Sequence, residues 1–203
     1  MWFWRSFQYL PPPSFAGVAP HLAVFFVYWA FRDLSVHAGP FALLPLGMAV
    51  CCGMVLTLSR GFAGMLAKAR RGGITGPIIA FAVLFFTLAV AASVAPVDRV
   101  VQMGWVIATL IYAALLTFSV MIFTPKELAR LPFRWASEHP TAQSAMWLTA
   151  IRYSAVVAGA SAIMVFGTVE DWVLFITFGR LAIWYFFDWV IILTIMTAPD
   201  EEP

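Results

Sequence analysis

Three ionisable side chains lie deep inside long apolar stretches of this 203-residue chain: Arg152, Arg180 and Asp188. An ionised group at the centre of a membrane span costs at least ~2.5 kcal/mol, so each is expected to face the interior of a helical bundle and to have a partner there. Such residues are the best candidates in the sequence for a functional site, because charge at membrane depth marks solute and proton paths as well as structural ion pairs.

Helix geometry narrows the pairing of these charges. Arg180 and Asp188 are separated by eight residues, which is about 12 Å along a helix and too far for direct contact. Arg152 and Asp188 lie at similar depths on two consecutive helices and are predicted to pair. Arg180 is then expected to reach outward toward Asp33, near the outer end of the first apolar run. The sequence leaves two roles open for these ion pairs: they hold the helices together, or they line a path for a solute or for protons.

Other kinds of chemistry are poorly represented. The histidines His21, His37 and His139 fall in separate segments without a second ligand at helical spacing, so neither a metal site nor a haem or other cofactor is predicted. We interpret His21 as an interfacial residue at a span boundary. No nucleophile motif or phosphate-binding loop is present, which argues against an enzyme. The net charge of +2 is too small for a nucleic-acid-binding surface.

The elements that must position these charges are membrane helices. Of the 203 residues, 63% are hydrophobic and only 11% are charged, and one span needs roughly 20 apolar residues. The chain is therefore predicted to be an all-α, polytopic membrane bundle forming one domain over 1–203, with the lipid bilayer as its first partner. Six apolar runs can be marked: Phe15 to Leu34, Phe41 to Leu58, Ile74 to Val94, Val100 to Phe123, Ala145 to Phe166 and Trp172 to Met196.

Cations and prolines suggest the path through the bilayer. Basic residues concentrate before the first run and after the second and fourth, so both termini are predicted to be cytoplasmic. Pro45 is the one proline placed within a span, where we expect a kink. Trp29, Trp105, Trp147 and Trp172 are expected to anchor span ends. The loop after the second run is either a short interfacial helix that binds anionic headgroups or a flexible loop; its cations are Arg60, Lys68, Arg70 and Arg71.

Small residues follow one side of the fifth run. Ala155 and Gly159 are four residues apart, a spacing that lets a second helix approach closely. The partner helix belongs either to this chain or to another membrane protein.

Two short patterns carry a family resemblance. The sixth run begins W-V-x-F-x-x-F-G, and the first run contains F-F-x6-D-L a few residues after Pro20; the residues are Trp172, Val173, Phe175, Phe178, Gly179, Phe25, Phe26, Asp33 and Leu34. With the order and spacing of the six runs, these patterns resemble the bacterial intracellular septation protein A family. The chain departs from the family at Ile176 and Gly159, where that family has a lysine and an asparagine.

The resemblance implies a non-enzymatic protein of the bacterial inner membrane. Such a protein would support cell-envelope biogenesis, septation and cell division by contacting other inner-membrane proteins, including the envelope-synthesis or division machinery. The buried charges support a different hypothesis, a small-solute or proton-coupled transporter. A third hypothesis is a scaffold subunit of a bioenergetic complex, docked through the small-residue stripe and neighbouring aromatic side chains.

Overall fold

The computed structural model describes residues 6–10, 15–38, 41–57, 79, 83, 87, 90, 91, 94, 95, 97–128 and 141–197. These residues are mostly helical, and three helices are long and apolar enough to cross a membrane: Asp98–Ile122, Thr141–Phe166 and Val169–Thr197. Two shorter apolar helices, Gly17–Phe31 and Pro45–Thr57, lie earlier in the chain. The helical membrane architecture agrees with the sequence prediction, whereas the run 74–94 and the basic loop with Arg60, Lys68, Arg70 and Arg71 fall mostly or wholly outside the described residues.

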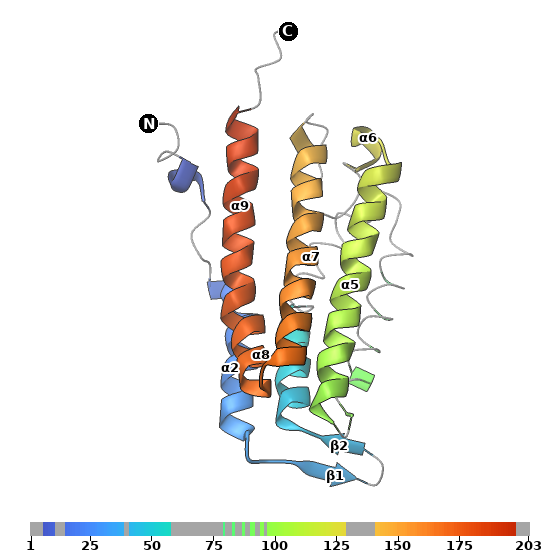
Figure 1. The fold of residues 1–203 in the computed structure, drawn as a ribbon, viewed down its shortest axis with the longest axis vertical. Coiled ribbons are helices and arrows are strands. Elements are labelled where there is room, and N and C mark those ends of the chain that lie inside the picture. Colours follow the sequence, from blue (N-terminus) through green and yellow to red (C-terminus); the bar gives the residue numbers. More distant parts are fainter. Residues whose placement is uncertain are drawn as a thin grey trace.

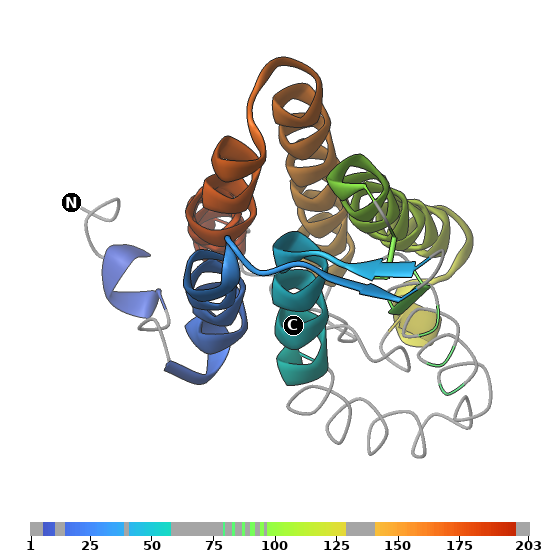
Figure 2. The ribbon, with the colours of Figure 1, turned by 90° about the horizontal axis from the view of Figure 1, so that it is seen from below.

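The longer helices form the body of the bundle (Figure 1). α7 (Thr141–Phe166) packs between α5 (Asp98–Ile122) and α9 (Arg180–Thr197). α9 continues from α8 (Val169–Leu174) through a five-residue π-helical turn, η2 (Phe175–Gly179). Seen from below, α2 (Phe15–Phe31) and the helix Pro45–Thr57 lie side by side against this row (Figure 2). Two short helices, η1 (Phe7–Tyr9) and α6 (Pro125–Leu128), lie at the periphery.

A short β-hairpin closes one end of the bundle, where the sequence predicts only a turn. Strands β1 (Val36–Ala38) and β2 (Phe41–Leu43) pair antiparallel, with His37 opposite Ala42. Because β2 takes the first residues of the second apolar run, the following helix begins at Pro45. Proline is favoured at the first helical position, where its missing N–H removes no hydrogen bond, so the predicted kink at Pro45 is wrong.

Proline lies inside a different helix. Pro20 is an internal residue of α2. A methyl group added at Gly53 would collide with the side chain of Val24 and would come within 3.1 Å of the carbonyl oxygen of Pro20. Glycine at position 53 therefore allows α2 and the helix Pro45–Thr57 to approach closely at this point.

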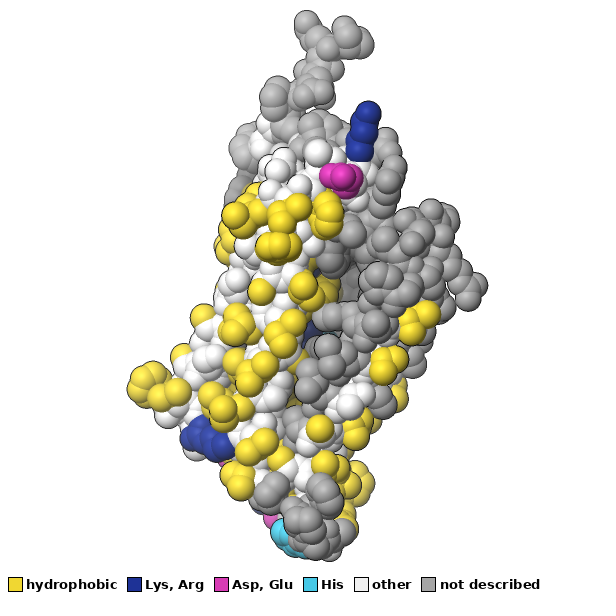
Figure 3. Space-filling view, turned by 90° about the vertical axis from the view of Figure 1, so that its right-hand side faces the viewer, with side chains coloured by type: hydrophobic (Ala, Val, Ile, Leu, Met, Phe, Trp, Pro, Cys, Tyr) yellow, Lys and Arg dark blue, Asp and Glu magenta, His cyan; other side chains and the backbone are white. Residues whose placement is uncertain are grey.

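The core divides into two apolar clusters along α7. One cluster, toward the hairpin, includes Val156 and Ala160 of α7 with Trp172 and Val173 of α8. The other includes Ala150 of α7 with residues of α5 and α6. Outside these clusters, many exposed side chains are large and apolar, and the charged side chains in view lie mainly toward the ends of the bundle (Figure 3). An apolar outer surface of this kind suits lipid better than water.

The initiation of α8 follows from a capping box. The side chain of Thr168 accepts a hydrogen bond from the backbone N–H of Asp171, and the Asp171 carboxylate accepts one from the backbone N–H of Thr168 at 2.9 Å. This reciprocal arrangement satisfies N–H groups that have no partner within the helix. It sets where the last long helical segment starts, and therefore the positions of Arg180 and Asp188 along it.

Candidate functional site

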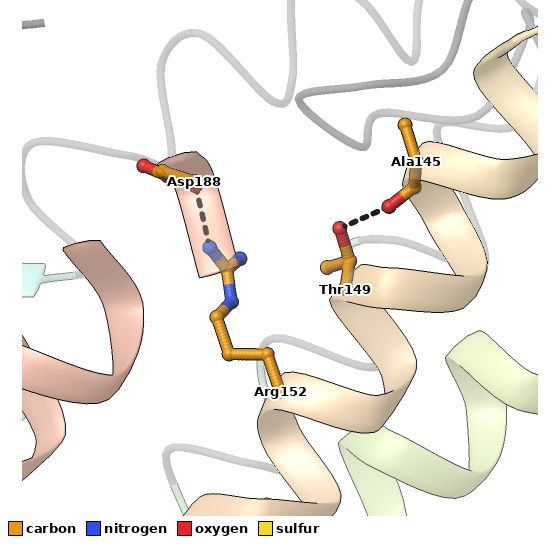
Figure 4. Close-up of polar contacts among 4 residues, drawn as sticks. All are labelled: Ala145, Thr149, Arg152 and Asp188. Atoms are coloured by element: carbon orange, nitrogen blue, oxygen red, sulfur yellow. Dashed lines mark hydrogen bonds and ion pairs between the residues drawn. The ribbon is translucent and has the colours of Figure 1, made fainter. Parts of the chain in front are cut away.

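A buried ion pair joins α7 to α9. Nη1 of Arg152 donates a hydrogen bond to Oδ1 of Asp188 at 2.8 Å, as Figure 4 shows. The two side chains are only 6% and 8% exposed, respectively. The pairing predicted from their matched depths is present. On α7, Arg152 lies between Ala150 of one apolar cluster and Val156 of the other, so the ion pair lies where the two clusters meet.

Trp184 connects this pair to the second arginine. Cζ of Arg152 lies 4.9 Å from the centroid of the Trp184 indole ring, and Cζ of Arg180 lies 4.8 Å from it. Arg180 also lies against Trp105 of α5, at 5.5 Å. Each cation over an indole face contributes about 0.5–2 kcal/mol, more where water is excluded. The indole rings thus stabilise the two guanidinium groups without neutralising them.

Asp33 does not reach this cluster. Its side chain is 92% exposed, and its carboxylate lies 3.7 Å from Nε of Arg32 beside it in sequence. The predicted pairing of Arg180 with Asp33 is therefore wrong, and Asp33 is not a buried charge. α2 ends at Phe31, so Asp33 lies beyond the helix and at the end of the bundle that carries the hairpin.

Arg180 has no carboxylate partner among the described residues. The groups that interact with it electrostatically are Tyr153, Arg152, Tyr112 and His21, and none of them is a carboxylate. Its Nε is buried and donates to no acceptor in the described part of the chain. The run 74–94, most of which lies outside the described residues, contains no acidic residue in its sequence. Within the described structure, Asp188 is engaged by Arg152 and is not among the groups that act on Arg180.

A small cavity opens beside Arg180. It has a volume of about 40 Å³ and is lined by residues of α2, the helix Pro45–Thr57, α5 and η2, together with Arg180 at the start of α9. The polar or aromatic residues among them are His21, Thr57, Trp105 and Arg180. His21 is buried, at 7% exposure, packs edge-on against Trp184 and hydrogen-bonds the backbone of Ile176. Our interpretation of His21 as an interfacial residue is therefore wrong.

The π-helical turn immediately before Arg180 is held by one aromatic ring. A methyl group added at Gly159 would lie 2.5 Å from Cζ of Phe175, and one added at Gly179 would lie 2.6 Å from Cδ2 of the same ring. Both glycines therefore accommodate the Phe175 ring, which packs η2 against α7. The backbone N–H of Arg180 donates to the carbonyl of Phe175, so this packing also sets where Arg180 begins α9. Isolated π turns inside α-helices occur frequently at functional sites.

The small residues of α7 lie in two different environments, one inside the bundle and one on its outer surface. Gly159 packs against Phe175 of the same chain, so its close partner is intramolecular. Ala155 is half-buried, whereas Ser154, Ala158 and Ala162 are exposed along one side of α7. The stripe thus serves the fold at Gly159 and leaves small side chains on the outer surface.

The two patterns that carry the family resemblance meet in space. Phe25 of α2 packs edge-on against Phe178 of η2, with ring centroids 5.4 Å apart. Phe26 and Phe178 are exposed, at 61% and 47%. Trp172 and Val173 are completely buried, and Trp172 packs against Trp105. The predicted interfacial anchoring of Trp105 and Trp172 is therefore wrong, because both side chains are part of the core.

Sequence reasoning missed the aromatic part of the site. Trp184 lies four residues after Arg180 and four before Asp188, so all three residues share one face of a helix. That spacing was a signal for Trp184. For Trp105 and His21 no such signal existed, since they come from other helices. Among the described residues, no group of three or more His, Cys, Asp or Glu side chains could hold a metal ion.

Comparisons of the chain with family models, with curated proteins and with solved structures give no match. The resemblance to the septation protein A family stays a prediction. Function is therefore inferred from the geometry of the cluster around Arg180.

Proposed function

We propose that this chain is a multi-pass protein of the bacterial inner membrane that binds a small solute inside its helical bundle and moves it across the bilayer. In this proposal six spans place both termini in the cytoplasm. The observation that carries it is Arg180: a cation inside the bundle, beside a cavity, with no carboxylate partner among the described residues.

The contrast between the two arginines supports a functional role. Arg152 has the counter-ion that a structural charge in a membrane needs, at 2.8 Å. Arg180 lies on the same indole ring and lacks one in the described chain. An unneutralised charge in a low-dielectric interior is costly, and in membrane helices such residues mark solute paths. A purely structural role for Arg180 would be served better by an apolar side chain.

The directions of the helices support the six-span arrangement. In Figure 1, α2 runs toward the hairpin, while the helix Pro45–Thr57 and α5 both run away from it. Parallel directions are expected if one more span connects these two helices. α7 returns toward the hairpin, and α9 runs away from it again. This alternation agrees with a chain that enters and leaves on one side of the bilayer.

Transport can be measured with the purified protein in liposomes. Stopped-flow light scattering follows the swelling of vesicles challenged with small neutral, cationic and anionic solutes. We expect one solute class to enter faster than in protein-free vesicles, and Arg180→Gln to reduce that rate at least tenfold. Arg99→Gln, at an exposed arginine in the first turn of α5, is the matched control and should leave the rate unchanged. If every solute class entered the protein-containing vesicles no faster than protein-free vesicles, the proposal would be contradicted.

A second candidate function rests on contacts with other membrane proteins. The meeting of Phe25 and Phe178, with Phe26 and Phe178 exposed, supports a surface for envelope-synthesis or division proteins in a non-enzymatic septation role. The exposed small residues Ser154 and Ala158 equally suit docking into a bioenergetic complex as a scaffold subunit.

Co-purification in mild detergent separates these contact functions. Stoichiometric recovery of envelope or division proteins, lost in a Phe26→Ala/Phe178→Ala variant, supports the septation role. Recovery of redox or proton-pumping subunits, lost in Ala158→Leu, supports the scaffold role. A protein that purifies alone with both surfaces intact contradicts both.

A further inference from the structure

Buried hydrogen-bond donors without acceptors gather around Arg180. Nε of Arg180 and Nε1 of Trp184 are both buried and donate to no described residue, as is also true of Nε of Arg152, and of these three residues only Arg180 lines the cavity. None of these groups can accept a hydrogen bond, so a second donor cannot satisfy any of them. Buried polar groups in native proteins almost always have a partner, and unpartnered ones point to a catalytic role or to a bound water or ion.

The charge balance gives the sign of the missing partner. Arg180 lines the cavity of about 40 Å³, and no described acidic residue lines it. Asp188, the carboxylate bound by the other arginine, accepts a hydrogen bond from Arg152 and is not among the groups that act on Arg180. One permanent positive charge therefore remains beside the cavity. An anion would neutralise it and accept hydrogen bonds from the guanidinium, whereas a cation would be repelled.

The size and shape of the site narrow the class of anion. A cavity of roughly 10–15 Å³ holds one water molecule, so about 40 Å³ holds about three water-sized groups. That volume suits formate or acetate and is too small for a sugar phosphate or a nucleotide. The indole rings of Trp105 and Trp184 lie over the guanidinium and accept no hydrogen bond, which leaves its planar N–H fork for an acceptor. A guanidinium fork matches a carboxylate, which it binds through two parallel hydrogen bonds.

We propose that the cavity beside Arg180 is a binding site for a small monovalent carboxylate, held by the guanidinium of Arg180. Phe175 and the π turn position this guanidinium, and His21 forms part of the cavity wall. The inference rests on the proposed function, since it names the chemical class of the solute that the bundle would bind.

Binding is tested by thermal unfolding of the full chain in detergent. Unfolding is followed by tryptophan fluorescence, with sodium formate replacing sodium gluconate at constant ionic strength. Because a ligand that binds only the folded state raises stability with the logarithm of its concentration, formate should raise the Tm relative to gluconate, which is too large for the cavity. Arg180→Gln should abolish the shift, and Arg99→Gln should retain it. Chloride should shift the Tm only at concentrations at least tenfold higher.

Arg180→Lys keeps the positive charge, and it is the variant to test if Arg180→Gln does not fold. It lacks the planar fork, so we expect its apparent affinity for formate to fall at least tenfold. Three results would overturn the inference: no formate-dependent shift in the original chain, an unchanged shift in Arg180→Lys, or an equal response to chloride. A formate-dependent Tm without vesicle flux would overturn the transport proposal and leave this site standing. Flux of a neutral or cationic solute without a formate-dependent Tm would overturn this site alone.

Discussion

Arg152 and Arg180 lie against the same indole ring, with Cζ atoms 4.9 Å and 4.8 Å from the centroid of Trp184. Two like charges are thus held close to one another inside an apolar bundle, and only one of them has a described carboxylate partner. The indole ring of Trp184 stabilises both arginines, and Asp188 neutralises Arg152. This asymmetry sets the expected behaviour of variants in the cluster.

The ion pair should behave as a coupled unit. Arg152→Ala removes the arginine that neutralises Asp188, and Asp188→Ala removes the carboxylate that neutralises Arg152, so each is expected to destabilise the protein by about 3–5 kcal/mol. The double variant removes both charges and should cost less than the sum of the two single changes. Thermal unfolding in detergent of the four proteins measures this coupling. Additive losses would mean that the 2.8 Å contact contributes no interaction energy.

Trp184 should contribute more than its apolar area. Trp184→Phe keeps an aromatic face for both arginines, whereas Trp184→Leu keeps apolar volume without that face. Because two cations share the ring, we expect Trp184→Leu to be less stable than Trp184→Phe by about 1–4 kcal/mol. Unfolding in detergent, followed by circular dichroism, compares the two variants. Equal stability would show that the ring acts only as a spacer.

Gly159 is expected to resist even the smallest substitution. The Cβ of Gly159→Ala would lie 2.5 Å from Phe175, whose ring is also held against Gly179. The resulting overpacking should cost about 1–3 kcal/mol, and Phe175→Leu in the same chain should recover part of the loss. Ala158→Leu, on the exposed side of the same turn, is the control and should change stability little. The melting temperatures of these variants provide the test; a neutral Gly159→Ala would contradict the close packing.

The capping box at Thr168 offers a separate test at the hairpin end. Thr168→Ala removes the hydroxyl that accepts from the Asp171 N–H, and should destabilise by about 0.5–2 kcal/mol. Thr168→Ser keeps an equivalent oxygen and should stay near the original stability. Hydrogen exchange of the α8 amides together with thermal unfolding provides the readout. Equal protection in the alanine and serine variants would argue against the cap.

The orientation in the bilayer can be tested with two exposed positions. His37 lies in β1, and Lys126 lies in α6, at the opposite end of the bundle. In a Cys51→Ala/Cys52→Ala background, a membrane-impermeant maleimide added to intact cells should label His37→Cys and not Lys126→Cys. Inverted vesicles should give the reverse. Labelling of Lys126→Cys from outside would overturn the cytoplasmic placement of both termini.

The membrane class, the helical elements and one ion pair followed from the sequence alone. Apolar run length depends only on local composition, and the depth of a charge along a helix depends only on residue count, so Arg152 and Asp188 could be matched from their positions. The i, i+4 spacing of Arg180, Trp184 and Asp188 was equally local. These quantities need no knowledge of which helices are neighbours.

Contacts between helices were decided only by the tertiary structure. Asp33 and Trp105 illustrate the reason. Asp33 lies near the end of the first apolar run, which suggests a pair with Arg180, but its side chain is exposed. Trp105 lies near the end of an apolar run, which suggests an interfacial position, but its side chain is buried. Rotation of a helix about its axis and the choice of its neighbour depend on packing of the whole bundle, which no local pattern encodes. The cavity beside Arg180, with walls from several helices, exists only once that packing is complete.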